Sequence, residues 1–483
     1  MCGFISIFAE KGKNVIEDII RGLLAIQHRG QDAAGIITFD EKFKTKKGLG
    51  LVRDVFGPKH LTRLTGNLAV GHVRYPTVGK GGETDVQPFG IDFPIGIAMA
   101  HNGNITNFIE LKKDYFPKRN VHLTSDCDLE AVLYVFASAL TKNGNIDVSP
   151  DRIFSAVEEV FRTVKGAYSV VGIIAGKGMF AFRDPYGIKP IILGSKVSRN
   201  EISYAVASES VVLDVIGYGN KEDLKPGEVI FVDQDKKLYR KKLSDKPHRP
   251  CIFELVYFAR PDSFLDKISV YKTRIRLGEY LAERWKETGF EADVVIPVPE
   301  SARIAALSMA QALGLPYREG FVKNRYIGRT FIMPRDEDRR SSVRAKLNTI
   351  RLEFKDKRVL IVDDSIVRGN TSKELVDLAK SAGASKVYFA SYSPPLRYPC
   401  PYGIDMATKR EFLARGRTEE EIAKEIGCDA VIYQRLEDLI HAGLKGNEEL
   451  ESFCTACFDG NYPTAEINDV LLDTIEKERN SLS

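Results

Sequence analysis

Short apolar runs broken by glycine and proline fill the first half of the chain. Runs of this kind are typical of buried strands. The stretches near residues 15–28, 128–140 and 151–164 instead carry apolar residues at helical spacing. The strand-like runs are GFISIF, AAGIITF, IGIAMAHNG and AYSVVGIIAG. This mixture predicts sheets layered with helices.

A polar and charged stretch at residues 232–250 divides this pattern from a second one. Beyond it, the apolar runs DVVIPVP, RVLIVDD and KVYFASYS alternate with helical patterns at residues 302–313 and 371–382. Alternation of this kind predicts βαβ units and a parallel sheet. We therefore predict two domains, residues 2–240 and residues 250–470, with a helical C-terminal segment on the second.

Charge and composition limit the kinds of partner. Lys and Arg number 70 against 66 Asp and Glu, so the net charge of +4 gives no electrostatic reason for a nucleic-acid or membrane partner. The first residues lack the basic region of a secretory signal, and the apolar run at residues 167–176 is half a membrane span. We expect a cytoplasmic protein that acts on small metabolites.

The cysteines are too few and too scattered for a disulfide scaffold. Their number is odd in a long chain, so chemistry or metal binding explains better those that cluster. The seven are Cys2, Cys127, Cys251, Cys400, Cys428, Cys454 and Cys457.

Cys2 directly follows the initiator methionine. Its small side chain permits removal of Met1, which would leave a thiol and a free α-amine on one residue. That amine titrates near ~8, against ~10.4 for a lysine, so it can act as a general base close to neutral pH. Cys2 would then be a nucleophile that carries its own base.

Polar clusters beside the strand-like runs complete this first site. They are MCGF, QHRGQDAAG, GHVRYPT, HNGNITN and TSDCD. Five such segments in this order resemble the N-terminal-nucleophile glutaminase domain of glutamine amidotransferases. The resemblance implies an αββα sandwich fold and release of ammonia from glutamine through a γ-glutamyl thioester on Cys2.

The same resemblance implies roles for four residues. Arg74 would pair with the α-carboxylate of glutamine and Asp126 with its α-ammonium, while Asn102 and the Gly103 amide would form the oxyanion hole. These roles suit the side chains, since a guanidinium grips a carboxylate bidentately and fixed amides stabilise a developing oxyanion. The alternative for Arg74 and Asp126 is an ordinary surface ion pair.

A second candidate site lies in KRVLIVDDSIVRGNTS. An apolar strand ends in Asp363 and Asp364, which places both acids at the carboxyl edge of a parallel sheet, where open α/β folds bind ligands. Small and hydroxyl-bearing residues follow at the start of a helix, where N–H groups and the helix dipole favour phosphate. The two carboxylates can accept hydrogen bonds from ribose hydroxyls or hold Mg²⁺. The alternative is a βα turn whose acids cap the helix.

This segment closely resembles the phosphoribosyl-diphosphate motif of type I phosphoribosyltransferases, which implies a parallel-sheet domain of that type. The binding positions implied are Asp363, Asp364, Ser365, Arg368, Gly369, Asn370, Thr371 and Ser372. With YFARPDS, IPVPES and KNRYIGRTFIMP, nearly the whole chain resembles the amidophosphoribosyltransferase family. The family's mobile loop implies further basic groups for the diphosphate at Lys323, Arg325, Arg329 and Lys346.

The family resemblance implies a reaction and its partners. Ammonia from glutamine would replace the diphosphate of phosphoribosyl diphosphate, giving 5-phosphoribosylamine and glutamate in the first committed step of purine biosynthesis. Mg²⁺ would be held by Ser301, Asp363 and Asp364, although Ala302 stands where family members commonly carry a second hydroxyl. The family also implies a homotetramer and inhibition by AMP- or GMP-type nucleotides.

Two other functions stay open at this point. One is a related glutaminase-superfamily enzyme whose acceptor is a sugar phosphate or aspartate, which the motif VLIVDDSIVRGNTS argues against. The other is a non-catalytic regulator that keeps the pockets as sensors. Intact Cys2, Arg74, Asn102 and Asp126 argue against it.

The remaining cysteines indicate a metal site. Cys454 and Cys457 form a CxxC, and two thiolates at that spacing can grip one ion. The family resemblance adds Cys251 and Cys400, implying a [4Fe–4S] cluster with a structural or oxygen-sensing role. Zinc is the alternative for the same four thiolates. Cys127 and Cys428 are expected to be small buried residues.

Overall fold

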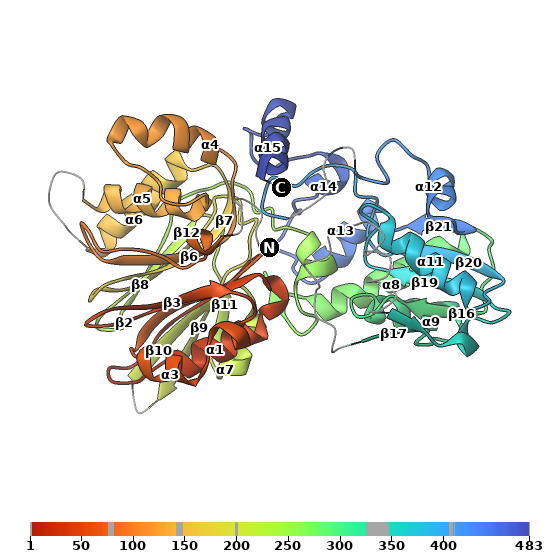
Figure 1. Cartoon of the computed structure of the whole chain (residues 1–483), viewed down its shortest axis with the longest axis horizontal. Coiled ribbons are helices and arrows are strands. Elements are labelled where there is room, and N and C mark those ends of the chain that lie inside the picture. The colour runs from red at the N-terminus through yellow and green to blue at the C-terminus, as the bar shows by residue number, and fades with distance from the viewer. Residues whose placement is uncertain are drawn as a thin grey trace.

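The chain folds into two halves that lie side by side (Figure 1). The computed structural model describes residues 2–75, 82–141, 148–198, 201–324, 347–404, 409 and 411–482. Strand β1 begins near the middle of the molecule, close to the boundary between the halves (Figure 1). A residue at this end of β1 therefore lies near both halves of the molecule.

The first half contains two antiparallel sheets. The first has the order β11-β9-β10-β1-β4-β2-β3 and the second the order β13-β12-β8-β7-β6-β5. The strands of the first sheet are β1 (Gly3–Phe8), β2 (Ala33–Asp40), β3 (Lys42–Leu49), β4 (Leu68–Arg74), β9 (Ile192–Ser198), β10 (Glu201–Ala207) and β11 (Gly219–Asp223). Those of the second are β5 (Phe89–Ile91), β6 (Ile97–Ile105), β7 (Gly166–Ile174), β8 (Gly178–Arg183), β12 (Glu228–Asp233) and β13 (Leu238–Lys242).

Helices cover the outer faces of both sheets. Helices α1 (Ile16–Ala25) and α7 (Ser210–Ile216) pack together on the first sheet, while α5 (Asp128–Leu140) and α6 (Pro150–Thr163) pack on the second. In α1, Ile16, Ile19 and Leu23 share one face and are buried against the sheet. The predicted αββα sandwich is confirmed. Short helices α2 (Val52–Val55), α3 (Pro58–Arg63) and α4 (Phe108–Glu110) lie in its connections.

Part of the stretch expected to connect the halves is regular structure. Strands β12 and β13 form a hairpin in which Val232 pairs with Leu238, and the rings of Phe231 and Tyr239 stack. The lysines of β13 lie on the edge of the sheet, where charge discourages pairing with another chain. The charged residues therefore did not mark a linker over this whole stretch. After β13, residues 243–250 form neither helix nor strand.

The second half is built on a parallel sheet with the order β16-β19-β20-β21, as the alternation of strands and helices predicted. Helices α8 and α9 pack together beside it, and α11 and α12 contact its strands β20 and β21. Its strands are β16 (Val294–Pro297), β19 (Arg358–Asp363), β20 (Lys386–Ser391) and β21 (Ala430–Tyr433). Its helices are α8 (Val270–Lys286), α9 (Arg303–Leu313), α11 (Asn370–Ser381), α12 (Glu419–Ile426) and α13 (Leu436–Leu444).

Smaller elements complete the second half. Helices α14 (Ala456–Asp459) and α15 (Asp469–Leu482) return to the boundary between the halves (Figure 1). Two further sheets have two strands each, β14 (Phe264–Leu265) with β15 (Ile268–Ser269), and β17 (Phe321–Lys323) with β18 (Leu347–Thr349). Within the described ranges, no helix has the length and apolar character needed to cross a membrane.

A buried ion network joins the halves. The guanidinium of Arg29 bonds Glu209 of the first half, and its Nη2 lies 2.8 Å from Glu254 Oε2 after the connection. Glu209 also accepts the Arg260 N–H at 2.9 Å and the Ser263 hydroxyl at 2.6 Å. Buried charges are costly unless paired, so this network favours one fixed arrangement of the two halves.

Candidate active sites

Cys2 is buried at the start of β1, where the first sheet ends. Gly3 pairs with Val73 of the neighbouring strand β4, which brings Cys2 beside Arg74. The Cys2 thiol donates a weak hydrogen bond to the Tyr75 carbonyl at 3.6 Å. The thiol is thus held at the end of β4 rather than in the hydrophobic core.

Asp85 links the two residues predicted to hold glutamine. Arg74 is only 4% exposed, and its Nη2 lies 3.6 Å from Asp85 Oδ2. The Asp126 N–H donates to Asp85 Oδ1 at 3.0 Å, while the Asp126 carboxylate forms a half-exposed ion pair with Lys112. Arg74 is therefore not a surface residue, whereas the Asp126 side chain lies in a surface ion pair. Asp85 carries no pattern that distinguishes it in the sequence, since acids are common in polar loops.

Asn102 and Gly103 lie in the buried strand β6. The ring of His72 in β4 contacts the His101 carbonyl at 3.1 Å, which brings this part of β6 to the end of β4 near Cys2. The Asn102 side chain is 0% exposed, and neither its Oδ1 nor its Nδ2 has a partner within the described part of the chain. Because buried amides are nearly always paired, Asn102 has the character of a group that awaits a ligand.

A network of polar side chains contacts β6 on either side of Asn102. Gln87 bonds both the His101 ring and the His101 N–H at 2.9 Å, and His101 Nε2 lies 3.4 Å from Asp128. Burial tends to raise the pKa of Asp128, but His101 and the Ile105 N–H hold it below its ordinary value. Asp128 is thus an anion that orients His101 and fixes the backbone on both sides of Asn102.

Asp363 and Asp364 lie where β19 ends, at the carboxyl edge of the parallel sheet, as predicted. Both are buried. Asp364 accepts hydrogen bonds from the Ser301 hydroxyl and, at 2.6 Å, from the Ser365 hydroxyl. Burial, and then the charge of Asp364, raises the pKa of Asp363 well above its ordinary value. A cation at this edge would stabilise both ionised acids.

The loop after these acids leads into α11 at Gly369, which has φ +81°. This positive φ favours glycine, and a Cβ at Gly369 would lie 2.6 Å from Leu413 Cδ2, so the Leu413 side chain would have to shift. Asn370 and Thr371 are exposed in the first turn, whereas Ser372 is buried, and exposed Arg368 pairs with Glu411 at 3.0 Å. The exposed groups of the turn leave room for a phosphate at the helix start.

The predicted basic loop is described only at its base. Lys323 is exposed at the end of β17 and pairs in register with Leu347 of β18. The other basic residues assigned to this loop lie outside the described residues; they are Arg325, Arg329 and Lys346.

The four clustered cysteines come together from three separate segments. Cys251 forms a parallel bridge with Cys454, and the Cys454 N–H donates to the Pro250 carbonyl at 2.9 Å. The Cys457 carbonyl accepts from the N–H groups of Arg397 and Tyr398, just before Cys400. All four are free thiols. In the described ranges, no group of three or more His, Cys, Asp or Glu side chains is arranged to hold a metal ion.

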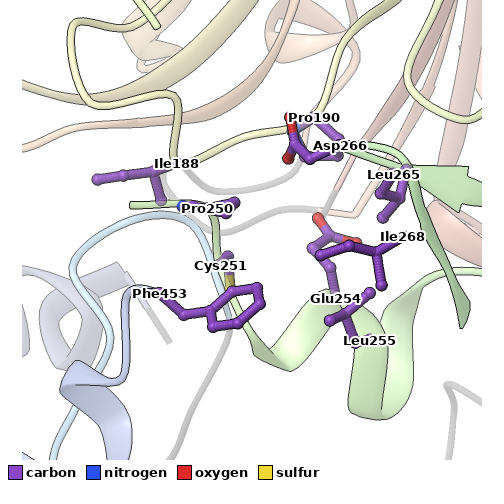
Figure 2. A pocket seen from close by; sticks show the side chains of 10 residues that line it. All are labelled: Ile188, Pro190, Pro250, Cys251, Glu254, Leu255, Leu265, Asp266, Ile268 and Phe453. Carbon is purple, nitrogen blue, oxygen red and sulfur yellow. The ribbon is translucent and has the colours of Figure 1, made fainter. Parts of the chain in front are cut away.

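These thiols also affect one another electrostatically. Burial, and after it the charges of Glu254 and Cys400, raises the pKa of Cys251 to about 12. Burial and the neighbouring cysteines raise the pKa values of Cys454 and Cys457 well above the ordinary value. Figure 2 shows Cys251 and Phe453 on one side of a cavity of about 10 Å³, with Glu254 and Ile268 on the other. This cavity has room for about one water molecule, so it is too small for a substrate.

The two isolated cysteines differ from each other. Cys127 is buried as predicted, and the Gln87 amide approaches its Sγ at 3.5 Å. Cys428 was expected to be buried but is only half-buried, because it precedes β21 in a turn where its thiol donates to the Ala430 carbonyl at 3.3 Å.

Each half of the chain matches a model of a known domain family. A model described as a glutamine amidotransferase domain matches residues 72–214, which include Arg74, Asn102, Gly103 and Asp126. A model described as a phosphoribosyl transferase domain matches residues 270–392, which include Asp363 and Asp364. Each matched region thus contains residues of one candidate site, although Cys2 lies before the first of them.

Known proteins resemble the chain along its whole length. The amidophosphoribosyltransferase of Escherichia coli K12 is 47% identical over 488 residues, covering 99% of this chain and 96% of that protein. That of Saccharomyces cerevisiae is 45% identical, covering 100% and 96%. A solved structure of glutamine phosphoribosylpyrophosphate amidotransferase from B. subtilis, complexed with ADP and GMP, matches with a TM-score of 0.85 at 35% identity, covering 97% of this chain and 98% of that one.

Proposed function

Because the chain belongs to the amidophosphoribosyltransferase family, we propose that Cys2 is the nucleophile of its glutaminase reaction and that Asp363 and Asp364 mark its acceptor site. The enzyme transfers ammonia from glutamine to phosphoribosyl diphosphate, giving 5-phosphoribosylamine, glutamate and diphosphate. This is the first step of purine biosynthesis. We also propose that its two domains span residues 2–240 and residues 250–470.

The glutaminase proposal depends above all on the unpaired, buried amide of Asn102. In the proposed reaction the Cys2 thiol gives its proton to the freed α-amine as its sulfur attacks the glutamine amide carbon, and the resulting α-ammonium later gives that proton to the leaving nitrogen. Asn102 Nδ2 and the Gly103 N–H would then bind the oxyanion of the tetrahedral intermediate, a role that fits an Asn102 amide without a partner among the described residues. Collapse of that intermediate releases ammonia and leaves a γ-glutamyl thioester for hydrolysis.

Arg74 and Asp126 would bind the two charged ends of the glutamine backbone. A substrate carboxylate could bind the Arg74 guanidinium, and a substrate ammonium could replace Lys112 beside Asp126. Asp85 contacts both residues, since it forms an ion pair with Arg74 and accepts a hydrogen bond from the Asp126 N–H. We therefore propose Asp85 as a positioning residue for glutamine binding.

Asp85→Asn tests this role. An amide would still accept from the Asp126 N–H but would no longer attract Arg74, so we expect the KM for glutamine to rise roughly tenfold with kcat changed by less than about threefold. Steady-state glutaminase kinetics measure both constants. Asp40→Asn is a matched control, since Asp40 lies in a surface ion pair with Lys44 at the far end of β2. An unchanged KM for glutamine in Asp85→Asn would show that Asp85 has no role in glutamine binding.

At the acceptor site, we propose that phosphoribosyl diphosphate lies across the carboxyl end of β19. The 5-phosphate would bind the loop of Ser365, Arg368 and Gly369 and the turn of Asn370, Thr371 and Ser372. Ser301, Asp363 and Asp364 would hold Mg²⁺, which when bound supplies positive charge for the leaving diphosphate. Ser301 already bonds Asp364, and the raised pKa of Asp363 fits a pair of acids that needs a cation. Lys323, Arg325 and Lys346 would contact the diphosphate.

We propose that Cys251, Cys400, Cys454 and Cys457 hold a [4Fe–4S] cluster, with zinc as the alternative. The support is that all four thiols are free and that Cys251, Cys400 and Cys454 each raise the pKa of Cys457, an effect that a metal binding the thiolates would offset. Protein purified without oxygen is expected to be brown with a broad visible absorbance, to contain iron, and to form phosphoribosylamine from glutamine and phosphoribosyl diphosphate in a coupled assay. Cys454→Ser should lose the colour and the iron, whereas Cys428→Ser should keep both. A colourless protein containing zinc would refute the cluster.

The assembly and regulation of the enzyme are also proposals. The B. subtilis structure with ADP and GMP supports inhibition of this enzyme by purine nucleotides. We further propose a homotetramer located in the cytoplasm, as the family resemblance implies.

A further inference from the structure

A short segment of the second half lies directly on the proposed oxyanion strand. This segment is residues 400–403, with the sequence Cys-Pro-Tyr-Gly. The Asn104 side chain in β6 donates its Nδ2 hydrogen to the Pro401 carbonyl at 2.8 Å, and the bond is buried. Two residues that are 297 positions apart in the chain are thereby joined next to the glutaminase site.

Gly403 makes the closest contact of this segment. A Cβ at Gly403 would lie 2.6 Å from the Gly103 carbonyl oxygen and 2.8 Å from the Gly103 carbonyl carbon. These distances are too short for any side chain, and Gly403 also has φ +90°, which favours glycine. The backbone of Gly403 therefore packs against the backbone of Gly103.

Gly103 also packs closely against strand β7. A Cβ at Gly103 would lie 2.0 Å from the Ala167 carbonyl oxygen of this neighbouring strand. Because both β7 and segment 400–403 contact Gly103, its peptide groups have little freedom to move. An oxyanion donor must be held in place before the reaction, because its energy is gained only if no reorganisation is needed.

Segment 400–403 is itself firmly anchored. Tyr402 is buried, and its hydroxyl contacts Thr464 Oγ1 at 2.8 Å. Two positions along that same C-terminal stretch, Glu466 accepts the Thr106 hydroxyl at 3.0 Å, at the end of β6. The segment is therefore part of a rigid attachment of the C-terminal region to β6.

We propose that segment 400–403 is a positioning element of the glutaminase site, with Gly403 and the Asn104–Pro401 hydrogen bond holding the Gly103 N–H where the oxyanion forms. This inference rests on the proposed oxyanion hole of Asn102 and Gly103. The glutaminase half is then incomplete without a contribution from the phosphoribosyltransferase half.

Gly403→Ala in the full-length enzyme tests the proposal. The added methyl group would displace Gly103, so we expect kcat for glutamine hydrolysis to fall about 10- to 100-fold, since loss of a whole oxyanion donor costs about 100- to 1000-fold. The KM for glutamine should change by less than about threefold, because Arg74 and Asp126 are untouched. Synthesis from added ammonia should be unchanged.

Two matched controls separate positioning from general damage. Gly416 has φ +70°, and a Cβ at Gly416 would meet no atom of the described residues within 4 Å, so Gly416→Ala brings a similar backbone strain without the contact. Asn104→Ala removes the bond to Pro401 and should also lower kcat, whereas Asn67→Ala removes a comparable bond to the Ala9 carbonyl at 2.9 Å, away from the site. Gly416→Ala and Asn67→Ala should keep both activities.

The outcomes distinguish this inference from the proposed function. If Cys2→Ala still hydrolyses glutamine, the proposed glutaminase site is wrong. If Cys2→Ala is inactive but Gly403→Ala and Asn104→Ala hydrolyse glutamine normally, only the positioning role is refuted. A loss of ammonia-dependent synthesis equal to the loss of glutaminase activity in both variants would also refute it, because that pattern indicates general misfolding. If Gly403→Ala does not fold, the kcat of Asn104→Ala for glutamine hydrolysis tests the positioning role instead.

Discussion

Cys2→Ala is expected to abolish synthesis from glutamine while leaving synthesis from added ammonia intact. The thiol is the proposed nucleophile, and it lies at the end of β4 beside Arg74. Removal of a nucleophile that acts together with its base lowers kcat by about 10⁴- to 10⁶-fold. Added ammonia bypasses this step, so we expect that rate to change by less than about twofold. A coupled assay with either nitrogen source measures both rates.

Cys428→Ala is the control for loss of a thiol. Cys428 is half-buried before β21 and contacts only its own turn among the hydrogen bonds described above. Both activities should persist in that variant. Equal loss of the two activities in Cys2→Ala would contradict the proposal of two separate sites, because a defect shared by both nitrogen sources cannot lie in the release of ammonia from glutamine.

Asp364→Asn should give the complementary result. The substitution removes a charge from the proposed Mg²⁺ site and one acceptor of the Ser301 and Ser365 hydroxyls. We expect synthesis from glutamine and synthesis from ammonia to fall together, by about 100- to 1000-fold, since both need the diphosphate to leave. Glutamine hydrolysis without phosphoribosyl diphosphate should be unchanged, as measured by glutamate release.

Asp293→Asn is the matched control on the same sheet. Asp293 lies before β16, at the opposite edge, in a surface ion pair with Arg358 at 2.7 Å. An exposed pair of this kind contributes at most about 1 kcal/mol to stability, so activity should be kept. If Asp364→Asn keeps ammonia-dependent synthesis, the proposed acceptor site at the end of β19 is wrong.

The sequence predicted the fold well where periodicity reflects burial. The apolar runs of β1, β6 and β19 and the helical pattern of α5 correspond to buried faces, and such faces follow directly from the spacing of apolar residues. Strand β13 was missed because it lies on the edge of a sheet. Its lysines resemble those of a polar linker, although Leu238 and Tyr239 pair and pack against β12.

Site residues were predictable where a local motif carries them. Cys2, Asn102, Asp363 and Asp364 each lie in a short stretch with a recognisable order of residues. The support given by Asp85 to Arg74 and by segment 400–403 to Gly103 depends instead on contacts between distant parts of the chain. No spacing or composition signals such contacts, because a carboxylate or a glycine at those positions looks like any other.

The contact between Gly403 and Gly103 also sets an order of events during protein synthesis. The ribosome has synthesised every strand of both antiparallel sheets once residue 242 is made, whereas residue 403 follows much later. At about 5–20 residues per second, the delay is on the order of ten seconds or more. We expect a nascent chain in this interval to leave glutamine intact, so that hydrolysis begins only after most of the half that consumes the ammonia has been made.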